Sequence, residues 1–213
     1  MKVRLLAATT PVLPGLSTAE DLIVYAARSS SPQNQFKVET GPRLLRYCIR
    51  HGHWSVFETA SMTLEIETSR AIAAQITRHR SFHFQEFSQR YAEVQRFEDI
   101  ELRRQAETNR QSSSEVIHDT GLKTAIEGVM DDVQALYRML LRRGVSRETA
   151  RMVLPMTTGT TICMTGSCRS WIHYLDLRTQ ENTQKEHRLV AEAARSHFEE
   201  VFPTVAQALK DEV

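Results

Sequence analysis

The sequence has few cysteines and lysines, and it lacks any long apolar run. Its three cysteines, Cys48, Cys163 and Cys168, are an odd number without CxxC spacing, which argues against a disulfide framework or a structural zinc site. We expect all three to be buried as small hydrophobic side chains. No apolar run approaches the ~20 residues that cross a bilayer, and the first ten residues lack the apolar core of a secretory signal. These absences predict a cytoplasmic protein without a membrane partner.

Lysine supplies only five of the 27 basic residues, so arginine predominates. Arginine binds phosphates and carboxylates through paired hydrogen bonds, although genomic codon bias would produce the same imbalance. The net charge of +1 provides no general positive potential and argues against a nucleic-acid partner. A length of 213 residues, with 41% hydrophobic and 25% charged residues, predicts one soluble domain spanning 1–213.

Short strands are predicted between longer helices. Predicted strands cover 3–9, 59–68 and 157–165. Helices are predicted after the N-cap Ser17, from Gly41 to Gly52, after Ser69, from Leu122 to Leu140, after Ser146, over 168–178 and over 184–200. Neither GxGxxG nor GxxxxGK[ST] occurs, which argues against a Rossmann fold and a P-loop. We therefore predict an α+β fold with a small, mainly antiparallel sheet packed by several long helices, and a polar excursion or mobile loop at 98–118.

The longest predicted helix repeats apolar residues at helical spacing from Leu122 to Leu140, and Gly144 is its expected terminator. We interpret it as a packing element. We expect no chemistry on it.

The segment ITRHRSFHFQEFSQRY, residues 76–91, gathers cations, aromatics and a carboxylate. Basic residues at a helix end would offset the helix dipole, but that explanation leaves Arg90 unexplained. An anion site, with arginines on phosphate and Ser88 supplying a hydroxyl, explains more of the segment. A metal held by His79, His83 and Glu86 is the competing hypothesis, and the flanking arginines argue against it because they would repel a cation.

Two other groups of residues carry charged or titratable side chains. RSWIHYLDLR, 169–178, fits an amphipathic helix with a solvated basic face, whereas Arg151 is expected to be buried in an apolar run and to need an anionic partner. His51 and His53 are expected to point to different sides as capping and packing residues. No nucleophile has an assured base, so the pattern favours electrostatic stabilisation of an anion by fixed positive charge.

Five ordered motifs resemble the flavin-dependent thymidylate synthase family. The signature is Arg78-His79-Arg80, seven residues, then Ser88-x-Arg90. The other motifs are AARSS at 26–30, HGHWSVFE at 51–58, ETARMVLP at 148–155 and SCRSWIHYLDLR at 167–178. The resemblance covers roughly residues 20–200. It implies reductive methylation of dUMP to dTMP, with methylenetetrahydrofolate as carbon donor and FAD, reduced by NADPH, as hydride source.

The resemblance also implies roles for individual residues and a homotetramer whose subunits share the sites. Arg178 is expected to stabilise ionised uracil, and Ser88 is placed with it as catalytic. The residues expected at the flavin are Ser30, Ser55, Glu58, Arg78, His79, Arg80, Glu86, Ser167, Arg169 and His173. Those expected at the nucleotide are Gln75, Arg78, Glu86, Phe87, Ser88, Gln89, Arg90, Arg151 and Arg178.

The sequence departs from the family pattern at four positions. Gln89 stands where many members have Gly, Ser167 and His173 where Asn is common, and Asn182 where His is frequent. These differences affect individual flavin contacts, since His can change charge and Asn cannot. A non-catalytic nucleotide-binding or RNA-binding module with a salt-sensitive arginine patch is the alternative from another class.

Overall fold

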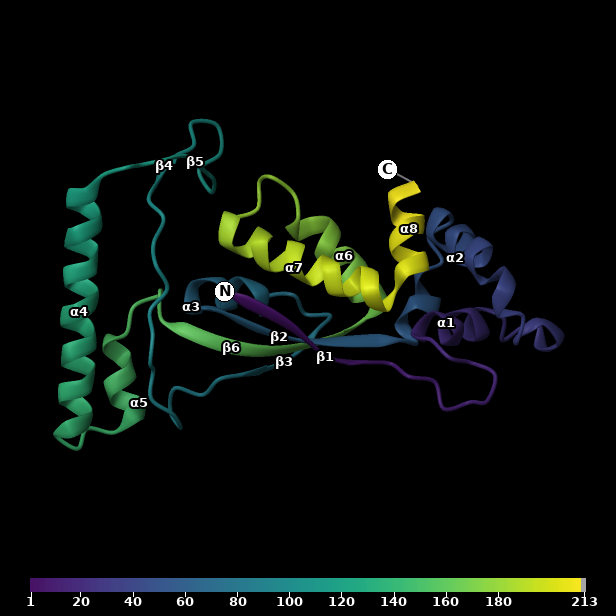
Figure 1. Ribbon diagram of the computed structural model, residues 1–213, viewed down its shortest axis with the longest axis horizontal. Coiled ribbons are helices and arrows are strands. Elements are labelled where there is room, and N and C mark those ends of the chain that lie inside the picture. Colours follow the sequence, from purple (N-terminus) through teal and green to yellow (C-terminus); the bar gives the residue numbers. More distant parts are fainter. Residues whose placement is uncertain (212–213) are drawn as a thin grey trace.

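A four-stranded antiparallel sheet forms the centre of the molecule (Figure 1). The computed structural model describes residues 1–211. The strand order is β1 (Lys2–Ala8), β2 (Ser61–Ser69), β6 (Gly159–Ser167) and β3 (His83–Glu86). Each neighbouring pair is antiparallel, which confirms the predicted α+β class. β3 was not predicted, and its four residues are extended because they pair with β6.

One face of the sheet is covered by helices. α6 (Cys168–Arg178) and α7 (Lys185–Val201) lie across it, with α3 (Arg70–Ile76) beside them (Figure 1). Residues of β2 alternate between buried Met62, Leu64 and Ile66 and partly exposed neighbours, as the period-two pattern predicts. The buried indole of Trp171 donates from Nε1 to the Met62 carbonyl over 3.0 Å, which ties α6 to the sheet.

Gly166 of β6 allows close packing against Phe82. A Cβ at this position would lie 2.4 Å from the ring of Phe82, which follows α3. The ring also packs edge-on against Trp171 with centroids 4.8 Å apart. Glycine is therefore needed at this position so that the 76–91 segment, which carries the arginine motif, can pack against β6.

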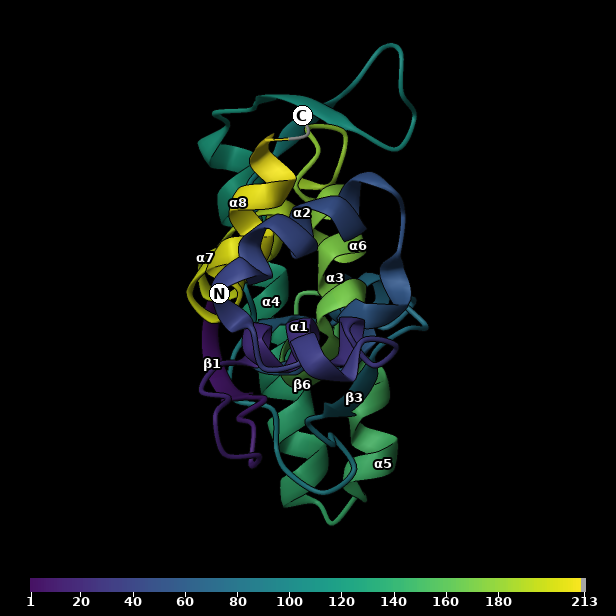
Figure 2. The same ribbon diagram turned by 90° about the vertical axis from the view of Figure 1, so that its right-hand side faces the viewer.

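A second group of helices lies at the opposite end of the molecule from α4 (Figures 1 and 2). It contains α1 (Ala19–Ala27), α2 (Gly41–Arg50) and α8 (Pro203–Asp211), and the last was not predicted. The N-cap of α1 is Thr18 rather than the expected Ser17, because Thr18 and Asp21 form a reciprocal capping box. Ser69 does precede α3 as N-cap, but its side chain makes no capping hydrogen bond. Short 3-10 helices connect these elements at Pro32–Asn34, Val38–Thr40 and Trp54–Glu58.

α4 (Thr120–Arg142) stands apart from the sheet with α5 (Arg147–Ala150) and the 3-10 turn Arg151–Val153 (Figure 1). Gly144 ends this helix region with a φ of 81°, as predicted. The helix predicted as a packing element buries only Tyr137 against the described chain. Leu122 and Val129 are 51% and 56% exposed. The apolar periodicity therefore marks a face that the described chain leaves open.

The polar excursion at 98–118 contains structure of its own. β4 (Arg103–Gln105) and β5 (Ser113–Val116) form a two-stranded antiparallel sheet. Arg103 is only 11% exposed and forms ion pairs on both sides, so the segment is anchored to the rest of the fold.

The cysteine expectation is correct for Cys48 and Cys168, whereas Cys163 is only half-buried because it lies on the open face of β6. Burial raises the pKa of the Cys48 and Cys168 thiols. Within residues 1–211, no helix combines the length and apolarity needed to cross a membrane. The cytoplasmic location stays a prediction.

Candidate active site

Arg178 and His79 join two motifs that are distant in sequence. Arg178 is the last residue of α6, and its Nε donates to Nε2 of His79 over 2.9 Å. Burial, with the Arg178 charge second, lowers the pKa of His79 to about 4. The imidazole is therefore neutral at pH 7 and accepts this hydrogen bond. Within residues 1–211 Arg178 forms no ion pair with a carboxylate, so its charge remains available to an anionic ligand.

A buried polar network lies behind this pair. The His79 ring packs edge-on against Tyr174, with centroids 4.9 Å apart. His187 of α7 contacts the Tyr174 hydroxyl through Nε2 at 3.2 Å and Gln75 Oε1 through Nδ1 at 3.2 Å. Burial, followed by the charges of Arg178 and His79, lowers the pKa of His187 to about 3. Burial also raises the pKa of Tyr174, so each of these groups is uncharged at neutral pH.

His187 was absent from the residues chosen on sequence, although a signal existed. It shares an apolar stripe of α7 with Val190, Ala191 and Ala194, at spacings of three, four and seven residues. A histidine on such a stripe must be buried and needs polar partners. Tyr174 of the same 169–178 helix is likewise buried, so the solvated face expected for this helix does not include it.

A second cluster gathers expected flavin residues around Glu58. Arg169 donates to Glu58 Oε1 over 3.0 Å, and the Ser167 hydroxyl donates to Oε2 over 2.8 Å. Ser167 also caps α6 by accepting from the Ser170 amide. His173, one turn beyond Arg169, packs edge-on against Trp54 with centroids 5.1 Å apart. The fold thus gathers part of the flavin set from α6 and the 3-10 turn that also carries exposed Ser55.

A third cluster joins two expected nucleotide residues through one acidic residue. Arg90 Nη2 donates to the Glu148 carboxylate over 3.0 Å, and Arg151 Nε lies 3.4 Å from the Glu148 carbonyl oxygen. Both arginines are accessible, so the expectation that Arg151 is buried is wrong. It follows α5 at the surface, where Met152 beside it is 78% exposed.

Four further nucleotide residues lie at the end of β3 and directly after it. Glu86 points to the sheet, where it pairs with Arg70 and accepts from the Thr160 hydroxyl over 2.8 Å. Phe87 donates its amide to the Thr161 carbonyl over 2.8 Å, and the Ser88 side chain is exposed. Gln89 Nε2 is buried without a hydrogen-bond partner among the described residues. Glu86 therefore contacts none of the other expected flavin residues within this chain.

The expected site residues do not converge in one chain. Arg78 and Arg80 are exposed, and neither guanidinium has a partner in the part of the chain that is described. Exposed Ser30 follows α1, whereas Arg151 follows α5, and Figures 1 and 2 place these helices at opposite ends of the molecule. A cavity of about 830 Å³ between α6, α7 and α8 is lined by only one expected site residue, His173. The candidate site is therefore open in the isolated chain.

The competing metal hypothesis finds no support in these side chains. In residues 1–211 no group of three potential ligands among His, Cys, Asp and Glu lies close enough to hold a metal ion. Glu86 is engaged by Arg70, and His79 by Arg178. His51 and His53 are capping and packing residues as expected, since His51 caps α2 and His53 precedes the 54–58 turn as its N-cap. They do not point to different sides, because both rings pack against Tyr47, with centroids 4.1 and 5.7 Å away.

Comparison with known proteins gives consistent results over the whole chain. Residues 11–204 match the family model described as thymidylate synthase complementing protein. A probable flavin-dependent thymidylate synthase of Paramecium bursaria Chlorella virus 1 is 49% identical, covering 98% of this chain and 99% of its own. A flavin-dependent thymidylate synthase of Synechocystis sp. is 48% identical, covering 99% and 100%.

A solved structure agrees with these relatives. The UMP/dUMP methylase PolB from Streptomyces cacaoi, bound with 5-Br dUMP, superposes with a TM-score of 0.84 at 25% identity. The match covers 99% of this chain and 94% of that one.

Proposed function

The chain belongs to the flavin-dependent thymidylate synthase family, and we propose that it catalyses the reductive methylation of dUMP to dTMP. The observation that carries the proposal is the contact of Arg178 with His79, which brings the 167–178 motif to the arginine motif at 78–90. The pair offers a fixed positive charge beside a neutral base. Such a charge stabilises negative charge on a uracil ring without a covalent thiol adduct.

The available cations suit FAD as the cofactor. The diphosphate of FAD needs cationic donors, and Arg78 and Arg80 offer exposed guanidinium groups without carboxylate partners. Glu58 already orients Arg169 and Ser167, so that cluster is preorganised toward a ligand. When bound, the flavin supplies the hydride that the one-carbon unit requires. We propose methylenetetrahydrofolate as the carbon donor and NADPH as the reductant because of the family resemblance.

For the nucleotide, Arg90 and Arg151 are the proposed phosphate residues. The ion pair of Arg90 with the Glu148 carboxylate is exposed, so a phosphate can displace that carboxylate at little cost. Arg151 contacts only the main-chain carbonyl of Glu148 and keeps its charge for the same phosphate. Arg178 is the proposed electrostatic catalyst at the uracil ring, and Gln75 contacts the same nucleotide. The structural relative PolB acts on UMP or dUMP, which makes the choice of sugar a necessary part of any assay.

We also propose that the sites are completed in a homotetramer. Two features of the single chain support this: the open apolar face of α4 and the separation of Ser30 from Arg151. A large exposed apolar stripe is the usual mark of a subunit interface. Residues from opposite ends of one chain can then meet across that interface.

The test is an absorption spectrum of the purified protein with and without NADPH, followed by a dTMP assay. Flavin absorbance that bleaches anaerobically with NADPH, and dTMP formed from dUMP with methylenetetrahydrofolate, are the expected results. UMP assayed in parallel defines the sugar preference. Colourless protein that fails to take up added FAD would contradict the proposal and favour the non-catalytic binding module.

A further inference from the structure

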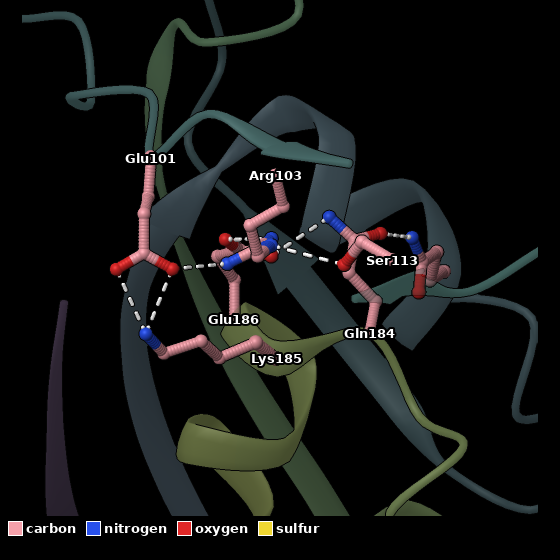
Figure 3. Close-up of polar contacts among 7 residues, drawn as sticks. Glu101, Arg103, Ser113, Gln184, Lys185 and Glu186 are labelled. Carbon is pink, nitrogen blue, oxygen red and sulfur yellow. Dashed lines mark hydrogen bonds and ion pairs between the residues drawn. The ribbon is translucent and has the colours of Figure 1, made fainter. Parts of the chain in front are cut away.

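Arg103 links the 98–118 excursion to the start of α7. Its Nη2 donates to Glu186 Oε1 over 2.5 Å, its Nη1 to Glu101 Oε1 over 2.8 Å, and its Nε to the Ser113 hydroxyl over 3.0 Å (Figure 3). Lys185 holds both Glu101 oxygens at 2.8 Å. Each of the three guanidinium nitrogens thus donates to a protein acceptor, so Arg103 is a structural anchor.

The anchor continues toward the proposed nucleotide site through side-chain amides. Gln184 Nε2 donates to Glu186 Oε2 over 2.9 Å, as Figure 3 shows. Gln75 Nε2 donates to Gln184 Oε1 over 2.6 Å. His187 Nδ1 lies 3.2 Å from Gln75 Oε1 and completes the connection to the network behind His79.

The direction of this chain of hydrogen bonds is set at its charged end. A guanidinium only donates and a carboxylate only accepts, so Glu186 forces Gln184 to turn its NH2 group toward it. Gln184 then presents its oxygen to Gln75, which must donate in return. That leaves the Gln75 oxygen to accept from His187, whose Nε2 accepts from the Tyr174 hydroxyl.

We propose that Arg103 and Glu186 are positioning residues that fix the orientation of the Gln75 amide for nucleotide binding. The inference rests on the proposed function, in which Gln75 contacts dUMP. One N–H and one carbonyl lone pair of Gln75 remain for a ligand, and a uracil edge carries donors and acceptors in a fixed order. A Gln75 amide turned by 180° would place its NH2 against a uracil donor and its oxygen against a uracil acceptor.

Glu186→Gln is the isosteric test. It keeps the number and positions of the side-chain heavy atoms but reverses the direction of the hydrogen bonds from residue 186 to Gln75. Arg103 still needs an acceptor, so the new amide turns its oxygen to Arg103 and its NH2 to Gln184. Each amide beyond it must then flip, including Gln75. We expect dUMP to bind about tenfold more weakly to the FAD-loaded enzyme, while FAD content and kcat at saturating dUMP stay within about twofold.

Adding Arg103→Ala to Glu186→Gln should restore much of the affinity, because the new amide is then free to turn back. Glu192→Gln, an exposed change on the same helix, is the matched control and should bind dUMP like the wild type. A double variant weaker than Glu186→Gln would overturn the inference. A Glu186→Gln variant that lowers only the thermal midpoint of unfolding, with unchanged dUMP affinity, would overturn it as well. Wild-type protein that binds neither FAD nor dUMP would instead overturn the proposed function, and the inference with it.

Discussion

Arg178 Nε donates to His79 Nε2 over 2.9 Å and thereby connects residues 99 positions apart. The acceptor is a neutral imidazole, so the guanidinium is oriented without losing its net charge. A carboxylate in the place of His79 would also have oriented the Arg178 guanidinium, but its negative charge would have cancelled the effect of the guanidinium charge on a ligand. This difference explains how a structural contact can leave Arg178 able to act on a ligand.

Arg178→Ala should retain the flavin and lose the reaction. Removing the charge at the uracil ring should lower dTMP formation by about 100-fold or more. The pKa of His79 should rise, because the Arg178 charge contributes to lowering it. Flavin absorbance, a dTMP assay and NMR titration of the imidazole measure the three quantities. Unchanged dTMP formation would contradict the role given to Arg178.

Acid should destabilise the fold through His187. Its pKa is about 3 in the folded chain against an ordinary 6.5, so below pH 6.5 the unfolded chain binds a proton that the folded chain does not. The free energy of unfolding should therefore fall as the pH drops from about 6.5 toward 3. In His187→Asn the slope should be shallower by up to about 1.4 kcal/mol per pH unit.

Urea titrations between pH 4 and 7 measure this slope. His118→Asn, a change at an exposed histidine, is the matched control variant. Equal slopes for the wild type and His187→Asn would show that the His187 proton is not linked to folding.

Val129→Glu should weaken subunit assembly without unfolding the chain. The side chain is 56% exposed in the isolated subunit, so a carboxylate there is solvated, but it would be buried in an interface. Light scattering after size exclusion should give a smaller particle than the wild type. Glu127→Gln changes a neighbouring exposed residue and should leave the mass unchanged. A tetramer that persists in Val129→Glu would remove this face from the interface.

Gly166→Ala should destabilise the core at the Phe82 contact. The added methyl would lie 2.4 Å from the ring, and overpacking of this kind costs about 1–3 kcal/mol. Chemical denaturation measures the change. Adding Phe82→Leu should recover part of the loss, because the smaller side chain vacates that space. Equal stability of Gly166→Ala and the wild type would show that the ring moves freely.

Local patterns predicted much of the fold. The alternation in β2, the β-branched run of β6 and the glycine after α4 were sufficient because each reflects a preference of neighbouring residues. β3 escaped prediction because its extended form depends on pairing with β6. The long apolar stripe of α4 was correctly recognised as helical, but periodicity does not say which molecule covers a stripe.

The same limit applies to the site. The arginine motif, the carboxylate at Glu58 and the α6 motif could be found in the sequence, and their resemblance to the family indicated their chemistry. The neutral state of His79, the burial of His187 and the anchoring of Arg103 could not be found, since each depends on groups from separate elements.

The sequence by itself determined the types of residue, their periodicities and the family to which they belong, because these are properties of the chain order. Only the tertiary structure decided that Arg178 is paired with an uncharged base and that Arg90 and Arg151 share Glu148. The physical reason is that charge and hydrogen-bond direction depend on burial and on partners, and both are fixed only when distant segments pack together.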